Sequence, residues 1–346
     1  MKTRFIFLLM VLIILALCAC SSQSNVQPTP TPSATSKIEL TPAPTATPTP
    51  TQSTVSYTTG LPLDVIPEYK PVGVVIENSA AARPQFGLQS ADVVYEAPVE
   101  GCTRFFCIFN DNLPEKIGPV RSARLYFIKI QQEWDSAFVH FGGPSSGYSN
   151  VYTSASDHID VRIDFIKGKY NDYYWRDNSK SAPHNAFTNV KALQTLLEEP
   201  ATIRPMIFDS AIEYPGQTIS DITLPFYTGA VTYKYDASQD LLTRHMDDKP
   251  FIDAETDQAV QVKNLVIQYC SFGHGDEAKG RWLCELLGSG KAEFVIGGKH
   301  IVGTWERENY ESKTTYKDSG GKEIVLRPGN TWIAIHPDSE KVTVNY

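Results

Sequence analysis

A long tract of Thr and Pro near the start limits how much of this 346-residue chain can fold. After Cys20, residues 21–56 are dominated by these two residue types and have almost no charged or large apolar side chains. Such a composition cannot bury enough apolar surface to form a core. Proline also favours the extended polyproline II conformation. We therefore expect residues 20–56 to form a disordered tether and the folded part to begin near residue 57.

The segment before the tether has the pattern of an export signal. Lys2 and Arg4 precede an uncharged run over residues 5–19 that is too short to span a membrane with its flanks. Residues 1–19 are therefore predicted to be a lipoprotein signal peptide. The sequence Leu17-Cys-Ala-Cys20 resembles a bacterial lipobox, which implies that acyl chains such as palmitate on Cys20 anchor the protein to the extracytoplasmic face of the cell membrane. An ordinary cleaved signal without lipid is the alternative.

Length and charge constrain the remainder of the chain. About 290 residues favour two domains, which we place at 57–205 and 206–346. The net charge is −8, and neither half contains a block of basic residues. This balance argues against nucleic acid as a partner, because binding through bulk charge needs a basic surface. Any recognition of an anion must therefore be local.

The first domain combines expected strands with expected helices. Short apolar runs bounded by turn residues predict strands over residues 71–77, 92–96, 104–109 and 136–141. Apolar residues at helical spacing after residue 123 predict a helix with Ser122 as its N-cap, and a second helix is expected over 188–199. We therefore predict an α/β or α+β fold for this domain.

Two arginines, Arg121 and Arg124, flank the start of the first expected helix. The N-terminus of a helix carries unpaired N–H groups and the positive end of the helix dipole, so cations are disfavoured there. An anion between the two arginines would remove the conflict. The sequence therefore predicts a negative group at this point, which is either a carboxylate of the protein or a ligand.

Further charged residues lie at expected strand ends and loops of the same domain. They permit two interpretations: an internal network of ion pairs, or a pocket in which guanidinium groups bind a carboxylate or phosphate. In an exported protein, the second interpretation points to a stem-peptide carboxylate or a teichoic-acid phosphate of the cell wall. The candidate ligand-binding residues are Arg83, Arg104, Arg121, Arg124, Glu77, Asp92, Glu96, Glu100, His140 and His184.

A catalytic interpretation rests on Gly143-Pro-Ser-Ser-Gly147, which matches the GxSxG pattern after an expected strand. Ser145 would be the nucleophile and His184 the base of an envelope hydrolase, with an aspartate between residues 157 and 177 orienting the histidine. The residues after Gly147 do not begin an amphipathic helix, so a simple tight turn is the alternative. The histidines lack the close spacing of zinc ligands, and we predict neither metal nor cofactor. We expect a binding protein rather than an enzyme.

The second domain is a series of short apolar runs separated by turns, which predicts a mainly antiparallel β structure. Gly297-Gly298 between two such runs is typical of a two-residue hairpin. Cys270 and Cys284 flank a Gly-rich connection between two expected strands. They form a candidate disulfide across a hairpin, and two separate buried thiols are the alternative.

Several stretches of the chain resemble the YerB-like lipoproteins. They are Gly73-Val-Val-Ile-Glu-Asn78, Arg83-Pro-Gln-Phe-Gly-Leu88, Ala91-Asp-Val-Val-Tyr-Glu96, Glu100 with Thr103-Arg104, Gly118-Pro-Val-Arg-Ser-Ala-Arg124, Pro183-His-Asn185, Gly303-Thr-Trp-Glu-Arg307, Gly321-Lys-Glu-Ile324 and Pro328-Gly-Asn-Thr-Trp332. The resemblance implies a two-domain exported lipoprotein and implies no reaction. We therefore expect a membrane-anchored protein that binds an anionic cell-wall component or an envelope protein. A hydrolase using Ser145 and a purely structural interaction protein are the alternatives.

Overall fold

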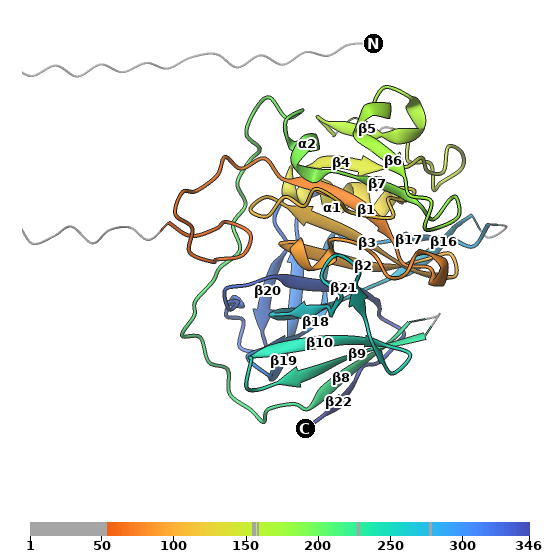
Figure 1. Ribbon diagram of the computed structural model, residues 1–346. Helices are drawn as coiled ribbons and strands as arrows, with labels where there is room; N and C mark the ends of the chain where they lie inside the picture. Colours follow the sequence, from red (N-terminus) through yellow and green to blue (C-terminus); the bar gives the residue numbers. More distant parts are fainter. Residues whose placement is uncertain (1–53, 154–156, 158, 227–228, 277–278) are drawn as a thin grey trace, which may run out of the picture. The chain divides into compact units, whose positions relative to one another are not determined.

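A computed structural model describes residues 54–153, 157, 159–226, 229–276 and 279–346 (Figure 1). The expected signal peptide, the lipidated Cys20 and the tether up to residue 53 lie outside the described residues. Residues 54–56, which we expected in the tether, belong to the fold. Val55 pairs with Pro62, and the buried hydroxyl of Ser56 accepts hydrogen bonds from the backbone amides of Thr58 and Thr59.

A ten-stranded sheet runs through both halves of the folded part (Figure 1). Its strands, in spatial order, are β20 (Thr315–Asp318), β19 (Lys299–Arg307), β18 (Gly288–Ile296), β15 (Asn264–Cys270), β21 (Thr331–Pro337), β2 (Val93–Val99), β3 (Cys102–Phe109), β1 (Val72–Glu77), β4 (Ala137–His140) and β5 (Arg162–Asp164). The N-terminal strands form a mixed sheet, since β1 pairs antiparallel with β3 and parallel with β4. In the C-terminal half, β15, β18, β19 and β20 pair antiparallel in that order. The strand β21 pairs parallel with both β15 and β2.

The other strands form a smaller sheet and three two-stranded pairs. The smaller sheet contains β11 (Lys249–Pro250), β10 (Leu241–Met246), β9 (Gly229–Asp236), β8 (Asp221–Phe226) and β22 (Thr343–Asn345), with β14 (Gln261–Val262) on β10. The pairs are β12 (Ile252–Asp253) with β13 (Gln258–Ala259), β16 (Phe272–Asp276) with β17 (Arg281–Cys284), and β6 (Tyr174–Arg176) with β7 (Ala186–Thr188).

Helices are few. In the described part of the chain, the α-helices are α1 (Leu125–Trp134) and α2 (Val190–Gln194), and short 3₁₀ helices occur at Ala80–Ala82, Leu88–Ser90, Phe165–Lys167 and Asn171–Tyr173. No helix among the described residues is long and apolar enough to cross a membrane. A mixed sheet with few helices, followed by mainly antiparallel strands, confirms the predicted α/β or α+β fold of the first half and the mainly antiparallel β fold of the second.

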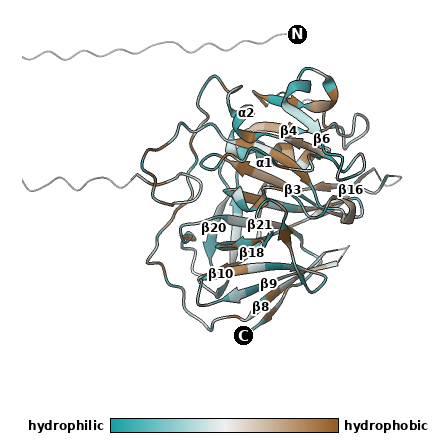
Figure 2. Ribbon diagram, viewed as in Figure 1, coloured by the Kyte–Doolittle hydropathy of each residue, from teal (hydrophilic) through white to brown (hydrophobic). Residues whose placement is uncertain are grey.

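The large sheet is buried on both faces because alternate residues of its central strands enter two different cores. Phe105 of β3 packs edge-to-face against Phe251 and Trp332 beside the smaller sheet. Phe106, the next residue, packs on the other face against Phe127 of α1 and Phe138 of β4. The hydrophobic residues gathered in β3, β4 and α1 are visible in Figure 2. Both cores therefore draw residues from both halves of the chain.

The first expected helix begins two residues later than the sequence predicts, with its N-cap at Arg124 and not at Ser122. Residues 120–123 are extended, because the amide of Arg121 donates to Val75 O at 2.8 Å and the amide of Ala123 donates to Gly142 O at 2.9 Å. The hydroxyl of Ser122 donates to Phe141 O at 3.1 Å and caps no helix. The N-cap residue is instead Arg124, whose side chain makes no capping hydrogen bond. Pairing with β1 and with the segment after β4 therefore prevails over local helix propensity.

The second expected helix is shorter than the predicted range 188–199. Thr188 is the last residue of β7, and its backbone pairs with Ile117. Asn189 is the N-cap, since its side chain accepts a hydrogen bond from the Ala192 amide at 2.9 Å. The helix therefore starts only where strand pairing ends.

Candidate functional site

A cavity of about 400 Å³ lies where the extended segment 120–123, the loop after β4 and two short strand pairs meet. Four arginines line it: Arg121 precedes α1, Arg124 is the N-cap of α1, Arg176 ends β6, and Arg281 begins β17. Ser122, between the first two, also lines it. Its other walls are Phe141, Gly142, Gly143, Pro144, Ile166 and Pro183. Among the described residues, no carboxylate side chain lines this cavity. We refer to it as the arginine cavity.

Arg121 is held against a buried carboxylate. Its Nε atom lies 3.3 Å from Glu77 Oε2, without the geometry of a hydrogen bond. Glu77 also accepts hydrogen bonds from the hydroxyl of Ser79 at 3.0 Å and from Nδ1 of His184 at 2.9 Å. An ionised carboxylate only accepts, so Nδ1 of His184 carries the proton in this contact. The predicted residues Glu77, Arg121 and His184 therefore form one cluster beside the cavity.

Arg124, the second arginine of the motif, forms an ion pair with Glu100. Its Nε atom donates to both carboxylate oxygens of Glu100 at 3.1 Å, and Nη2 makes a further short contact. Arg281 Nε lies 3.8 Å from the same carboxylate. Burial acts to raise the pKa of Glu100, but the hydrogen bond and charge of Arg124 outweigh it and hold this pKa below its ordinary value. Glu100 is therefore ionised at neutral pH.

Arg104 lies buried behind the cavity in β3. Its Nη1 atom donates to Ser122 O at 2.8 Å, whereas its Nε atom has no hydrogen-bond partner among the described residues. Burial, and then repulsion by Arg124, lower the pKa of Arg104 to about 10. Arg104 remains a cation at neutral pH and adds its charge to the wall that Ser122 forms.

Two lining arginines, Arg176 and Arg281, were not predicted from the sequence. Arg176 donates from Nη1 to the side-chain oxygen of Asn185 at 2.8 Å and lies over the Phe141 ring at 4.6 Å. Arg281 donates to the hydroxyl of Ser149 at 3.5 Å and comes from the C-terminal half of the chain. Neither belongs to a motif that marks an anion site, so no local signal in the sequence could have found them.

The arrangement favours an anion. Arg121 and Arg124 each contact one carboxylate, whereas Arg176 and Arg104 contact none among the described residues. Four arginines (Arg104, Arg121, Arg124 and Arg176) thus face two carboxylates (Glu77 and Glu100), which leaves an excess of positive charge even when Arg281 is not counted. Guanidinium groups present planar pairs of N–H donors that match carboxylate and phosphate oxygens. The cavity therefore has both the space and the donors to bind such a group.

Four of the predicted site residues lie away from the cavity and have other partners. Arg83 donates to the backbone and side-chain oxygens of Asn78 and lies 4.0 Å from Asp247. Asp92 accepts hydrogen bonds from the Thr58 hydroxyl and from two backbone amides.

Glu96 and His140 are the other two predicted site residues that lie away from the arginine cavity. Glu96 is fully buried and bonds to Thr103, Arg244 and Trp332 at 2.6, 2.8 and 3.0 Å. His140 Nδ1 donates to Gly142 O at 2.7 Å, and its Nε2 accepts from Arg162 at 3.0 Å. Burial lowers the pKa of His140 to about 4, so this histidine is neutral at pH 7. Both side chains are fully engaged inside the fold.

The structure does not bring the proposed catalytic pair together. Ser145 is exposed in the loop after β4, whereas the His184 ring bonds to Glu77 and Ser79. Among the described residues, none of the recorded hydrogen bonds joins Ser145 to His184. Turns follow Ser145 over residues 146–153, where a nucleophile elbow would begin a helix. A hydrolase using Ser145 stays a prediction without geometric support. The described part also contains no cluster of three or more His, Cys, Asp or Glu side chains suited to a metal ion.

Cys270 and Cys284, the candidate disulfide pair, are free cysteines in the structure. Phe272 lies opposite Cys284 in the β16–β17 pair, so these cysteines do not face each other across that hairpin. Both are buried. Burial and a hydrogen bond with Cys270 raise the pKa of the Cys284 thiol well above its ordinary value. The Cys284 thiol is therefore protonated at neutral pH.

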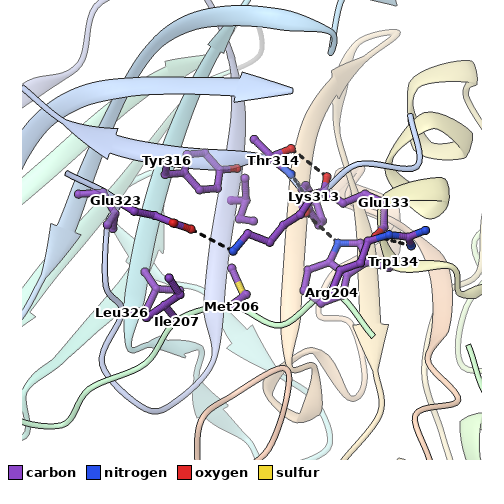
Figure 3. Close-up of a pocket in the computed structure, with 13 residues that line it drawn as sticks. Glu133, Trp134, Arg204, Met206, Ile207, Lys313, Thr314, Tyr316, Glu323 and Leu326 are labelled. Carbon is purple, nitrogen blue, oxygen red and sulfur yellow. Dashed lines mark hydrogen bonds and ion pairs between the residues drawn. The ribbon is translucent and has the colours of Figure 1, made fainter. Parts of the chain in front are cut away.

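A second cavity, shown in Figure 3, is too small to be the site. Its volume is about 30 Å³, which holds one or two water molecules. Lys313 lies along it and bonds to Glu323 at 3.1 Å, while the Thr314 amide donates to Glu133 at 2.7 Å (Figure 3). These polar groups therefore already have hydrogen-bond or ion-pair partners within the protein. Only the arginine cavity, of the two, combines space with an excess of one charge.

Fold and sequence together place the chain in a family of two-domain proteins of unknown function. Residues 58–202 match the N-terminal domain described as "Protein of unknown function (DUF3048)", and residues 222–333 match the C-terminal domain of the same family. The chain therefore belongs to the DUF3048 family.

One relative of the chain is the "Putative lipoprotein YerB" of Bacillus subtilis (strain 168). It is 32% identical over 290 residues, which cover 81% of this chain and 85% of the relative. The crystal structure of the YerB protein from Bacillus subtilis matches this chain with a TM-score of 0.72 at 30% identity, covering 85% of this chain and 100% of the solved one. The predicted resemblance to YerB-like lipoproteins is confirmed.

Proposed function

We propose that this protein is a membrane-anchored extracytoplasmic lipoprotein that recognises an anionic ligand in the arginine cavity. Two observations support the location: the lipobox-like sequence ending at Cys20, and the name of the relative, a putative lipoprotein. The ligand is a carboxylate or phosphate of a cell-wall component, free or displayed by an envelope protein. The protein acts as a binding or scaffolding component and not as a catalyst.

The observation that carries this proposal is the set of guanidinium groups around an open space of about 400 Å³ without a lining carboxylate among the described residues. The carboxylates of Glu77 and Glu100 contact Arg121 and Arg124 from outside the cavity. They orient these two side chains and neutralise only part of the charge. Because Arg121 and Arg124 are already held in place, less side-chain entropy is lost when an anion binds to them.

Isothermal titration of the full-length protein in detergent with inorganic pyrophosphate tests the proposal. Arg176→Gln removes a lining guanidinium that has no carboxylate partner among the described residues. A hydrogen bond to a charged group contributes about 1.5–3 kcal/mol, so we expect binding to weaken by about tenfold or more.

Arg204→Gln is the matched control. Arg204 donates to the backbone carbonyls of Gln132 and Glu133 and does not line the arginine cavity. We expect this variant to bind pyrophosphate like the wild type. Equal weakening by both substitutions, or no binding of pyrophosphate, phosphate or succinate by the wild type, would contradict the proposal.

A further inference from the structure

We propose that the ligand of the arginine cavity is an amphiphile, a phosphate or diphosphate ester whose apolar part lies on the wall formed by Phe141, Pro144 and Ile166. This inference rests on the proposed function and narrows the chemistry of its ligand. It is drawn from the charge of the cavity and from the apolar side chains at its rim.

The charge favours phosphate over a single carboxylate. One guanidinium fork already satisfies both oxygens of a carboxylate, as Arg124 does for Glu100. Arg176 and the buried Arg104 remain without a carboxylate among the described residues, and Arg121 reaches Glu77 only through a contact without hydrogen-bond geometry. A phosphate monoester carries a charge of about −1.5 to −2 at pH 7 and three acceptor oxygens. It therefore suits a site with several incompletely satisfied cations.

The rim favours an apolar group next to that phosphate. Ile166 lines the cavity, yet 61% of its surface is exposed to solvent. Tyr148, which is 85% exposed, lies in the loop between Pro144, a lining residue, and Ser149, which contacts Arg281. Phe141 and Pro144 continue the apolar wall inward. Exposed large apolar side chains beside a charged cavity are typical of a binding site with a polar and an apolar part.

Ile166 is held in place by the backbone around it. The carboxylate of Asp164 accepts hydrogen bonds from the Gly142 amide at 2.8 Å and from the Ile166 amide at 3.2 Å. Gly142 has a φ of 66°, and a Cβ atom there would lie 3.3 Å from Ile166 Cδ1. The absence of a side chain at Gly142 thus lets Ile166 pack directly on the loop that forms the cavity wall. The apolar rim is therefore fixed relative to the arginines.

The location proposed above makes lipids an accessible source of such an ester. A chain anchored through Cys20 stays near the membrane surface, where phosphate groups are attached to apolar chains. A water-soluble sugar phosphate offers the same phosphate with a polar partner. The two sources differ only in the group that would contact Ile166.

Titration of the full-length protein in detergent with methyl phosphate, glucose 1-phosphate and hexyl phosphate separates these sources. We expect hexyl phosphate to bind at least tenfold more tightly than methyl phosphate, and glucose 1-phosphate to resemble methyl phosphate. Within the Ile166→Ser variant, we expect hexyl phosphate and methyl phosphate to bind with affinities that differ by no more than about twofold, so that the advantage of the hexyl chain is lost. Ile203 is 43% exposed and does not line the cavity. The Ile203→Ser variant should therefore still bind hexyl phosphate at least tenfold more tightly than methyl phosphate.

The outcomes distinguish this inference from the proposed function. Equal binding of all three esters, with the affinity still reduced by Arg176→Gln, would overturn the amphiphile and leave anion recognition intact. Tight binding of glucose 1-phosphate that Ile166→Ser does not change would identify a soluble sugar phosphate and also overturn it. Binding of succinate with no binding of any phosphate ester would reject the phosphate. Failure to bind any anion would contradict the proposed function itself.

Discussion

Asp92 has a structural role at the point where the chain enters the fold. Its buried Oδ2 atom accepts hydrogen bonds from the Thr58 hydroxyl at 2.8 Å and from the amides of Asn110 and Asp111 at 2.8 and 3.1 Å. Burial, followed by the charge of Asp111, raises the pKa of Asp92 to about 7. A residue that we predicted to bind a ligand is therefore an anchor for residues 56–59.

The raised pKa of Asp92 predicts a loss of stability as pH rises. Between its ordinary pKa of 3.8 and about 7, the folded protein binds a proton at Asp92 that the unfolded chain does not. The free energy of unfolding therefore falls as pH increases through this window. From pH 5 to pH 8 the contribution is about 2–3 kcal/mol.

Comparison of wild type with Asp92→Asn isolates this contribution. The asparagine side chain has no titratable proton, so urea unfolding of the variant at pH 5 and pH 8 should lack this pH-dependent contribution. Other groups such as His140 titrate alike in both proteins. The free-energy difference between variant and wild type should therefore shift by about 2–3 kcal/mol in favour of the variant at the higher pH. A difference independent of pH would refute the raised pKa.

At the residue scale, sequence reasoning found the part of the site that lies in one motif. Arg121 and Arg124 were predicted because two cations bracket an expected helix start, and both line the cavity. Arg176 and Arg281 were missed because the fold brings them there from β6 and β17. Glu96 was assigned to the ligand because the sequence does not show that Arg244, almost 150 residues later, is its partner.

At the scale of single elements, backbone pairing decides where helices begin and where strands can lie. Residues 120–123 read as the start of a helix in the sequence but pair with β1 and with the segment after β4. The apolar spacing that predicts the helix is correct from Phe127 onward, since Phe127, Ile130 and Trp134 are buried on α1. Periodicity therefore identified the helix, while its start depended on hydrogen bonds to distant residues.

Glycine at position 303 allows the outer strands of the large sheet to pair. A Cβ atom on Gly303 of β19 would lie 1.9 Å from the backbone oxygen of Lys317 in β20, and a backbone atom cannot move aside as a flexible side chain can. We expect Gly303→Ala to destabilise the protein by about 3 kcal/mol through displacement of β20.

Gly273→Ala is the matched control for this prediction, because nothing lies within 4 Å of a Cβ atom at Gly273 in β16. Denaturant unfolding monitored by tryptophan fluorescence should show a lower midpoint for the first variant and an almost unchanged midpoint for the second. Equal midpoints would mean that β20 does not pair with β19 as described.

At the scale of the whole folded part, the two family segments form one structure. Val93 to Glu96 of β2 pair with Thr331 to Ala334 of β21, so the large sheet continues from one segment into the other. The buried ion pair of Glu96 with Arg244 also crosses between them. The two-domain division at residues 205 and 206 stays a prediction about the chain's organisation. Apolar runs and the turn residues between them predicted each half's fold class, whereas strand pairing between halves leaves no local pattern in the sequence.

This continuity predicts that the described part unfolds cooperatively. Separating the segments would expose the edge of β2 and leave Arg244 buried without its carboxylate, which costs several kcal/mol. Differential scanning calorimetry of the full-length protein should therefore show one unfolding transition, with equal calorimetric and van't Hoff enthalpies. Two resolved transitions would show that the segments are independent domains.

The claim on which the rest depends is that the arginine cavity binds an anion. A crystal structure of the protein soaked in tungstate tests it directly, because anomalous scattering locates this phosphate-like ion without ambiguity. We predict an anomalous peak within hydrogen-bonding distance of Arg121, Arg124 and Arg176, lost in a crystal of Arg176→Gln. An empty arginine cavity, with tungstate bound only at other surface sites, would contradict the account.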